Sequence, residues 1–252
     1  MKRRLILHPP SHPMFLVLLL FIAIAPLIWL YFIPKAIALA FLPLGLGVHV
    51  GYTIAVLMVL LSMALSPVNV VLMEVPRQVA VPDFEYVSIF GIPYPTLRVR
   101  YVMSSTVVAV NLGGAVIPLA ISILVVSLLA VHQSGAQGLG VLVGVAALVT
   151  VVSHLSSRIV PGVGIVVPAL IPPLVSALSA ITLSAALGVM SLAPSIAYAG
   201  AVIGTLLGAD VLNLVKHFDK LQSPMVSIGG AGTFDGIYLS GIIALFLALI
   251  LT

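Results

Sequence analysis

Long apolar runs that carry almost no charge constrain this chain more than any other feature. The runs extend over about residues 14 to 33, 48 to 72, 102 to 131, 138 to 153, 165 to 190, 195 to 216 and 235 to 252. A helix needs about 20 apolar residues to cross a bilayer, so most of these runs are long enough to span one. Only 6% of the residues are charged, against roughly 25% in soluble domains. The sequence therefore predicts an all-α, polytopic transmembrane helical bundle with about seven spans.

Two segments near the N-terminus need separate interpretations. The run from Met14 to Phe32 is too long for the apolar part of a signal peptide and no small-residue cleavage site follows it, so we interpret it as a retained anchor helix. Residues 36 to 47 are too few, and too interrupted by Pro43, Gly45 and Gly47, to span a bilayer. This segment is predicted to be an interfacial or re-entrant piece.

The basic residues predict the orientation in the membrane. With a cytoplasmic N-terminus and seven spans, Lys35 is the basic residue left outside, and the inner side receives Lys2, Arg3, Arg4, Arg77, Arg98, Arg100, Arg158, Lys216 and Lys220. This distribution is the positive-inside bias of multi-pass proteins. We therefore predict a multi-pass protein of the cell membrane, with the N-terminus cytoplasmic, the C-terminus outside and the lipid bilayer as partner. The net positive charge reflects this topology, and no nucleic-acid partner is expected.

One segment alternates in the manner of β-strands. Phe84 to Phe90 and Thr96 to Tyr101 place apolar and polar residues in turn, and residues 91 to 95 separate them with a glycine and two prolines. The pattern predicts a small cytoplasmic β-hairpin. The chain is thus expected to form one transmembrane domain, 1–252, with 74–101 as an extramembrane insertion that caps the bundle.

Asp210 and Asp235 are the two acidic residues that fall within or beside apolar runs. A carboxylate at membrane depth costs several kcal/mol unless it is paired, protonated or in contact with water, so each one is a candidate functional residue. Asp235 follows a glycine-rich stretch and could instead cap a helix N-terminus. Asp210 could instead pair with Lys216 near the membrane interface.

Helical spacing places the polar residues of the sixth run on one side. Asp210, Asn213 and His217 share a face if the run is a regular helix. A second face carries small residues at four-residue spacing, which lets another helix approach closely: Gly200, Gly204 and Gly208. We therefore expect Asp210 to face protein or a cavity. An antiparallel neighbouring helix would bring Asp235 to a similar depth.

Breaks in three runs occur near the same leaflet. Pro and Gly free backbone groups, and such breaks are tolerated where they line a cavity. Asn111 precedes one break, which lies in the inner half of the third run. We predict a cytoplasm-facing polar site in which the two aspartates are supported by Asn111, Asn213, Pro168, Ala169, Leu170, Gly208, Gly230 and Gly232.

Several other chemistries are excluded by the sequence. There is no cysteine, and the six histidines do not form a metal-binding pattern. The phosphate-binding pattern Gly-x-x-x-x-Gly-Lys-Ser/Thr and the zinc-binding pattern His-Glu-x-x-His are absent. No metal and no cofactor are therefore predicted.

From about residue 58 onward, the chain resembles a family of archaeal and bacterial polytopic membrane proteins that is described only as a domain of unknown function. The residues that carry this resemblance are Ala109 to Pro118, Val163 to Pro173, Gly208 to Leu214 and Ser227 to Gly236. The resemblance implies a membrane protein and no activity.

A second resemblance is to presenilin-like intramembrane aspartyl proteases, whose motifs are Tyr-Asp, Gly-x-Gly-Asp and Pro-Ala-Leu. Here Phe234-Asp235, Gly208-Ala209-Asp210 and Pro168-Ala169-Leu170 stand at the corresponding places. Leu207 and Ala209 occupy the two glycine positions, and the order of the motifs along the chain differs. The resemblance implies that the two aspartates act as a catalytic pair.

Three functions remain open at this point. The first is an intramembrane aspartyl-protease-like hydrolase, with Asp210 and Asp235 as acid and base and a transmembrane peptide as substrate. The alternative is a proton- or cation-coupled transporter or channel, in which the same pair binds a small ion between broken helices. The third is a structural or assembly protein in which the polar cluster only locks helices together.

Overall fold

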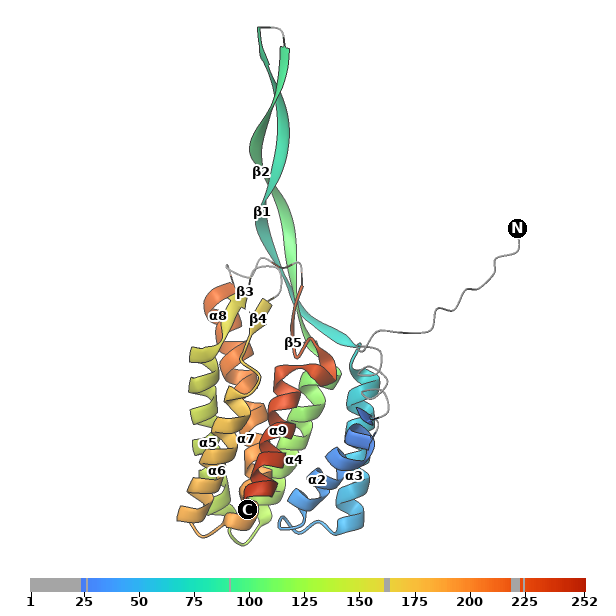
Figure 1. Ribbon diagram of the computed structural model, residues 1–252, viewed down its shortest axis with the longest axis vertical. Helices are drawn as coiled ribbons and strands as arrows, with labels where there is room; N and C mark the ends of the chain where they lie inside the picture. The colour runs from blue at the N-terminus through green and yellow to red at the C-terminus, as the bar shows by residue number, and fades with distance from the viewer. Residues whose placement is uncertain (1–23, 26, 91, 161–163, 219–222, 224) are drawn as a thin grey trace, which may run out of the picture.

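The computed structural model is a helical bundle with a long β-ribbon rising from one end (Figure 1). It describes residues 24–25, 27–90, 92–160, 164–218, 223 and 225–252. The helices are α2 Ile33–Phe41, α3 Val48–Leu65, α4 Ile117–Val131, α5 Gly135–Ser156, α6 Ile171–Ala186, α7 Ala193–Thr205, α8 Leu212–His217 and α9 Gly236–Leu251. Three π-helical segments, Ile28–Phe32, Leu112–Val116 and Leu206–Val211, and two 3₁₀ turns, Met190–Leu192 and Gly232–Phe234, extend them. The strands are β1 Asn69–Ile89, β2 Ile92–Asn111, β3 Arg158–Val160, β4 Gly164–Val166 and β5 Met225–Ile228.

Four helices in the described part of the chain are long and apolar enough to cross a membrane. They are Val48–Leu65, Leu112–Val131, Gly135–Ser156 and Met190–Lys216. Three shorter apolar helices lie beside them: Ile28–Phe41, Ile171–Ala186 and Gly236–Leu251. These lengths and compositions indicate insertion into a membrane. Of the roughly seven predicted spans, four correspond to helices that are long enough to cross one.

The prediction of an all-α fold is wrong, because a mostly helical chain also carries two sheets. In the larger sheet, β1 pairs antiparallel with β2 from Asn69↔Asn111 to Ile89↔Ile92, with one irregularity at Val71/Met73. β5 adds to β2 in parallel, and the order is β1-β2-β5. Strands β3 and β4 form a separate antiparallel pair. Residues 102 to 111, expected to begin the third span, extend β2 instead, because the segment is rich in β-branched residues.

The hairpin is confirmed, but it is not small. Its strands reach beyond the predicted limits of 74 and 101, to Asn69 and Asn111. The turn falls between Ile89 and Ile92, and Phe90 takes a φ of 53° there. This backbone conformation is typical of two-residue hairpin loops. The residues Pro93, Tyr94 and Pro95, expected in the turn, instead begin β2.

The separate segment predicted at 36 to 47 does not exist as such. The chain is helical from Ile28 through Phe41, and the break comes at the turn before α3. Pro34 lies inside this helix, next to the junction of the π-helical segment and α2, where its missing N–H interrupts the regular hydrogen-bond pattern. Lys35, predicted to lie outside the membrane, is therefore part of this helix. Residues 14–23 of the predicted first span lie outside the described part of the chain.

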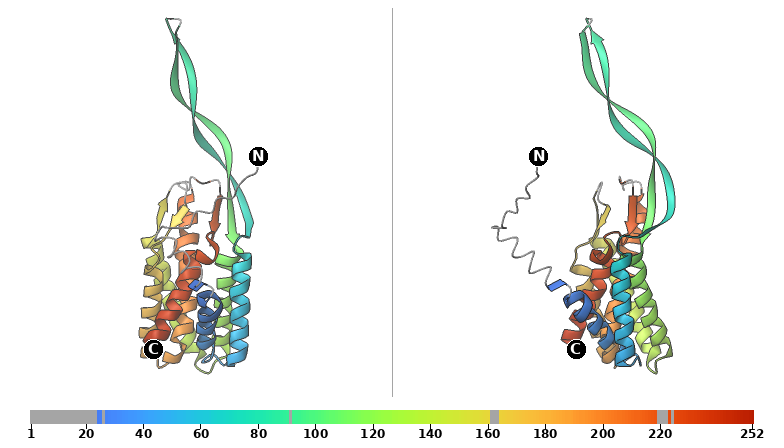
Figure 2. Two further views of the ribbon diagram at one scale, coloured as in Figure 1. Left: turned by 45° about the vertical axis from the view of Figure 1, so that its right-hand side comes forward. Right: turned by 90° about the vertical axis from the view of Figure 1, so that its right-hand side faces the viewer.

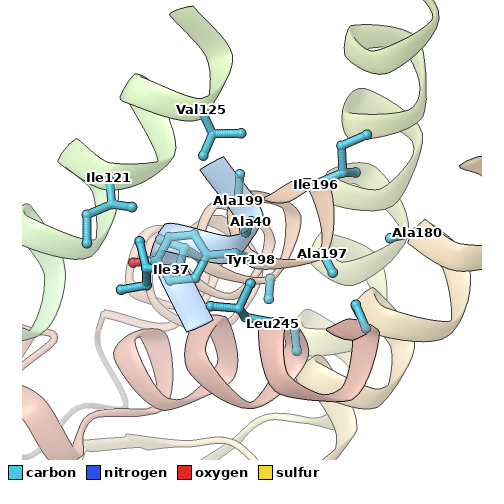
Figure 3. Packing of buried hydrophobic residues seen from close by; sticks show 14 of the residues in the cluster. Ile37, Ala40, Ile121, Val125, Ala180, Ile196, Ala197, Tyr198, Ala199 and Leu245 are labelled. Atoms are coloured by element: carbon cyan, nitrogen blue, oxygen red, sulfur yellow. The ribbon is translucent and has the colours of Figure 1, made fainter. Parts of the chain in front are cut away.

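Helix α7 lies at the centre of the bundle and is buried along almost its whole length. Figure 3 shows the ring of Tyr198 beside Ile37 of α2, with Ile121 and Val125 of α4 and Leu245 of α9 nearby. The Tyr198 hydroxyl donates a hydrogen bond to the carbonyl of Pro118, at 3.5 Å.

The predicted stripe of small residues packs against α5. Gly200 and Gly204 lie against the side chains of Val145 and Val149. Gly208 lies against the backbone of Thr150, where an added Cβ would come within 2.2 Å of the Thr150 carbonyl oxygen. The close approach of the two helices therefore depends on glycine at this position.

The two ends of the bundle differ in construction. The ribbon, β3, β4 and β5 all lie at one end, which we call the ribbon end (Figures 1 and 2). The turns at residues 42–47, 132–134 and 187–189 and the C-terminus lie at the opposite end. The strands therefore form a layer over the ribbon end of the helices, and the candidate site lies beneath it.

Candidate functional site

Asp210 and Asp235 lie together at the ribbon end. Both line a cavity of about 450 Å³ and a smaller one of about 230 Å³, and Ile165 of β4 lines both cavities as well. The larger cavity is bounded by β4, β5 and the turn after β5. The smaller cavity lies between the first turn of α9 and the segment that precedes α6. The sequence-based expectation that the two acids share one depth therefore matches their placement in the structure.

Asp235 is the N-cap of α9. Its Oδ1 accepts a hydrogen bond from the Ile237 amide at 2.9 Å, and its Oδ2 accepts one from the Ala231 amide at 3.3 Å. Its extended backbone, with φ −71° and ψ 151°, is the usual conformation of an N-cap. The capping role considered from the sequence is thus present, and it fixes the carboxylate at the wall of both cavities.

Asp210 lies within the π-helical segment Leu206–Val211 and is half-buried. The backbone amide of Gly229 faces its carboxylate, and the charge of Asp235 is close enough to act on it. Lys216, considered as its partner, instead places Nζ 3.1 Å from Nε2 of His154. Among the described residues, no salt bridge joins Asp210 to a basic side chain. Asp210 therefore lines both cavities together with Asp235.

The turn that follows β5 carries the amides that face the two acids. Gly229 and Gly232 adopt φ values of 72° and 63°, which favour glycine. A Cβ on Gly114 would lie 2.2 Å from the Gly229 carbonyl oxygen, so the two backbones are in direct contact. The Thr233 amide donates to Oγ of Ser66 at 3.2 Å. The turn is thus held between the end of α3 and the start of the helix that begins at Leu112.

Asn111 supports this region without entering it. It is fully buried at the N-cap of the helix that begins at Leu112, and its Oδ1 accepts from the Gly114 amide at 2.8 Å. Its Nδ2 donates to the Ser66 carbonyl at 2.8 Å and to Oδ1 of Asn69 at 3.1 Å. Its expected place in the inner half of a span is wrong, because β2 continues to this residue. Asn111 joins three segments and does not line either cavity.

Asn69 is a site residue that the sequence analysis missed. It lines the larger cavity, and its Oδ1 accepts hydrogen bonds from Asn111 and, at 2.6 Å, from Oγ of Ser227, another lining residue. The run from 48 to 72 was interpreted as one apolar helix, so Asn69 was expected near the end of a span. The clue was its place next to β-branched residues after the turn at Pro67.

Some of the predicted site residues in the Pro-Ala-Leu break and in the glycine-rich turn line a cavity, and others do not. Gly230 lines the larger cavity and Ala169 the smaller one. Pro168 and Leu170 are exposed and line neither cavity. Gly232 lines neither cavity and packs against Ser66.

Asn213 and Gly208, predicted to support Asp210, line neither cavity. Asn213 is buried, and its Nδ2 donates to Oγ of Ser157 at 2.6 Å and to the carbonyl of Ala209, the residue before Asp210, at 2.8 Å. Gly208 packs on α5.

The N-terminus of helix α9 lies at the site, where Asp235, Gly236 and Ile237 line the smaller cavity. The N-terminus of a helix carries a partial positive charge that stabilises anionic groups. Among the described residues, no group of three His, Cys, Asp or Glu side chains is arranged to hold a metal ion.

Comparison with known proteins gives a family and no activity. No curated protein and no solved structure matches the chain. A family model described as a protein of unknown function, DUF1614, matches residues 63–247. This match covers more than half of the chain, both aspartates and the whole ribbon. The chain therefore belongs to the DUF1614 family.

Proposed function

We propose that this protein is an intramembrane hydrolase that cleaves peptides with Asp210 and Asp235 as an acid–base pair. One observation carries the proposal: both carboxylates line the same two cavities and face amides of the same turn. Two carboxylates in one cavity repel each other when both are ionised, so the pair is most stable with one proton between them. A shared proton gives a pair in which one member is an acid and the other a base.

The hydrogen bonds assign a role to each member. Both oxygens of Asp235 accept backbone N–H bonds at a helix N-terminus, which stabilises its ionised form. Asp235 is therefore the general base, and the shared proton resides on Asp210, the general acid.

The proposed reaction adds water across a peptide bond. The Asp235 carboxylate takes a proton from water while the water oxygen attacks the carbonyl carbon, and Asp210 donates its proton to the carbonyl oxygen. The product of this step is a neutral gem-diol. When the C–N bond breaks, the leaving nitrogen receives the proton from Asp235, and the Asp210 carboxylate takes one back from a hydroxyl. The pair returns to its starting state.

Strand edges beside the acids favour a peptide over an ion. β5 is an outer strand of its sheet and β4 belongs to a two-stranded sheet, so both have a free edge. Residues of both strands line the larger cavity. Free strand edges bind extended peptides through backbone hydrogen bonds, and an extended peptide exposes the carbonyl that water must attack. The N-terminus of α9 also favours a developing oxyanion over a cation.

A second candidate function is proton- or cation-coupled transport. It is favoured by one observation, namely that the two acids lie where helices are interrupted: Asp210 in a π-helical segment and Asp235 at the start of α9. Transporters place their ion sites at such interruptions. A purely structural role is the third candidate, supported by the hydrogen bonds through which Asn111 and Asp235 join segments.

The distribution of basic residues between the two ends of the bundle supports a proposed topology. Basic residues at the ribbon end include Arg98 and Arg100 of the ribbon, Arg158 of β3 and Lys216 of α8, and the turns at the opposite end contain no Lys or Arg. By the positive-inside rule, the ribbon end faces the cytoplasm. We propose one multi-pass domain in the cell membrane, with the ribbon as a cytoplasmic insertion, the N-terminus inside and the C-terminus outside. Its partners are the bilayer and a transmembrane peptide, and no nucleic acid.

The test uses Asp210→Asn and Asp235→Asn in the full chain, purified and reconstituted into vesicles. Asp83→Asn on the exposed ribbon is the matched control. A panel of helical transmembrane peptides is incubated with each protein, and products are identified by mass spectrometry. Cleavage by the wild type and by the control, lost by at least 100-fold in either site variant, supports the hydrolase.

The same vesicles report ion flux and folding. Asn caps a helix about as well as Asp, so Asp235→Asn is expected to fold. Wild-type flux of protons or cations that either substitution removes would replace the hydrolase with the transporter. Absence of both activities in every form, with lower melting temperatures for both variants, would leave the structural role.

A further inference from the structure

The ribbon has two chemically different faces. Residues paired across an antiparallel ribbon share a face. Pro82 pairs with Val99, Phe84 with Leu97, and Tyr86 with Pro95, so one face is apolar. On the other face Asp83 pairs with Arg98, and Arg98 also forms a salt bridge with Glu85. Arg100, which pairs with Val81, lies on this second face as well, so the second face carries charges that the first face lacks.

No described residue of the same copy covers the apolar face. We define the apolar ribbon face by six large side chains that the register places together: Phe84, Tyr86, Leu97, Val99, Tyr101 and Met103. Their exposed fractions lie between 58% and 72%. The outer part of the ribbon stands clear of the bundle in every view (Figures 1 and 2). A two-stranded ribbon alone in water is marginally stable, because it has no second layer to cover its apolar residues.

We propose that the apolar ribbon face is the contact between two copies of this chain. The ribbon continues along the long axis of the bundle and away from it (Figure 1). A two-fold axis along the membrane normal therefore brings two ribbons face to face while both bundles stay in one bilayer with the same orientation. Contact of this face with the protein's own bilayer would require the ribbon to fold over by a right angle.

The area of the face approaches that of a standard dimer contact. Three of the six side chains are aromatic and bury about 150–250 Å² each when fully covered. The other three are smaller, so the six, which are about two-thirds exposed, provide at most about 700 Å² per copy. A standard interface takes about 800 Å² from each partner. The two ribbons would form a sandwich of two layers about 10 Å apart. Its outer faces would carry the Asp83, Glu85 and Arg98 charges, which stay in water.

Cysteine cross-linking tests the contact, because the chain contains no cysteine of its own. Leu97→Cys lies on the apolar ribbon face, and its matched control, Thr96→Cys, lies on the opposite face one residue away. With the two-fold axis parallel to the ribbon, each residue faces its own counterpart. In the full chain in phospholipid vesicles, a thiol-specific cross-linker with a reach of about 10 Å should join Leu97→Cys copies at least ten times faster than Thr96→Cys copies.

A second variant separates self-association from other occupants. Leu97→Asp, in the cysteine-free chain, should raise the dimer dissociation constant in detergent by at least tenfold, measured by sedimentation, and leave the helical circular dichroism unchanged. Equal cross-linking of the two cysteine variants, or a wild type that sediments as a monomer at micromolar concentration, would overturn the proposal. The proposal would also be overturned if vesicles protected Leu97→Cys from a soluble thiol reagent without a second copy of the chain, because lipid would then cover the face.

Discussion

At the scale of single residues, the site depends on contacts between backbones. The turn that faces the two acids touches the start of the helix after Asn111 where Gly114 meets Gly229, and no side chain separates them. Such a contact leaves no room for a methyl group. The acids are therefore positioned by residues that have no side chain and take no part in the chemistry.

Gly114→Ala tests this dependence. The added Cβ would lie 2.2 Å from the Gly229 carbonyl oxygen, and overpacking of this kind costs about 1–3 kcal/mol or more. We expect a lower melting temperature and, because the turn carries amides for both acids, a loss of any activity that depends on them. The control is Gly140→Ala on α5, where a Cβ would meet nothing within 4 Å. Equal melting temperatures for the two variants would contradict the close contact.

The residue scale also shows what the sequence could and could not predict about the site. The placement of Asp210 and Asp235 on the same cavities was predictable, because two apolar runs joined by a short connection form neighbouring antiparallel helices. The placement of Asn213 outside the cavities was not, because its predicted face assumed a regular helix through Leu206–Val211. Asn69 was missed because its partners Asn111 and Ser227 are brought to it by strand register, which hydropathy does not report.

At the scale of elements, apolar runs predicted the existence of helices well and their limits poorly. Hydropathy alone does not distinguish a span from a strand when both are rich in Val. Residues 102 to 111 were therefore assigned to a helix, although they form the last half of β2. The β-branched residues in this segment carried the missing information. The hairpin was predicted because alternation is visible near its tip, where charged residues stand between the apolar ones.

The ribbon should be separable from the bundle. Arg77 pairs with Ser104 in the same kind of register as Ile89 with Ile92, because the two pairs lie an even number of positions apart along each strand. Replacing residues 78–103 by Asn-Gly should therefore close the hairpin with a tight turn. The outer ribbon packs on no helix, so we expect the shortened chain to keep its melting temperature within about 3 °C, a shift that corresponds to under about 1 kcal/mol.

Size and stability are measured together on this shortened chain. Sedimentation in detergent should show a monomer, because the apolar ribbon face has been removed. A shortened chain that fails to fold would mean that the ribbon supports the bundle. A shortened chain that remains a dimer would move the contact between copies to the helices.

At the scale of the whole molecule, the two ends of the bundle should lie on opposite sides of the membrane. The chain lacks cysteine, so single cysteines can be placed without background. Gln133→Cys and Ser191→Cys lie at the end opposite the ribbon, and Thr96→Cys lies on the ribbon. In intact cells, a thiol reagent that does not cross membranes should label the first two and should reach Thr96→Cys only after permeabilisation. Labelling of all three in intact cells would contradict the proposed orientation.

Strand β2 connects the far tip of the ribbon to the interior of the bundle in one piece. It begins at Ile92 and ends at Asn111, and its last residues pair with β5, which leads directly into the turn that faces the acids. Strand pairing therefore joins the base of the ribbon to the turn that holds Asp235, so the register between β2 and β5 decides where that turn lies.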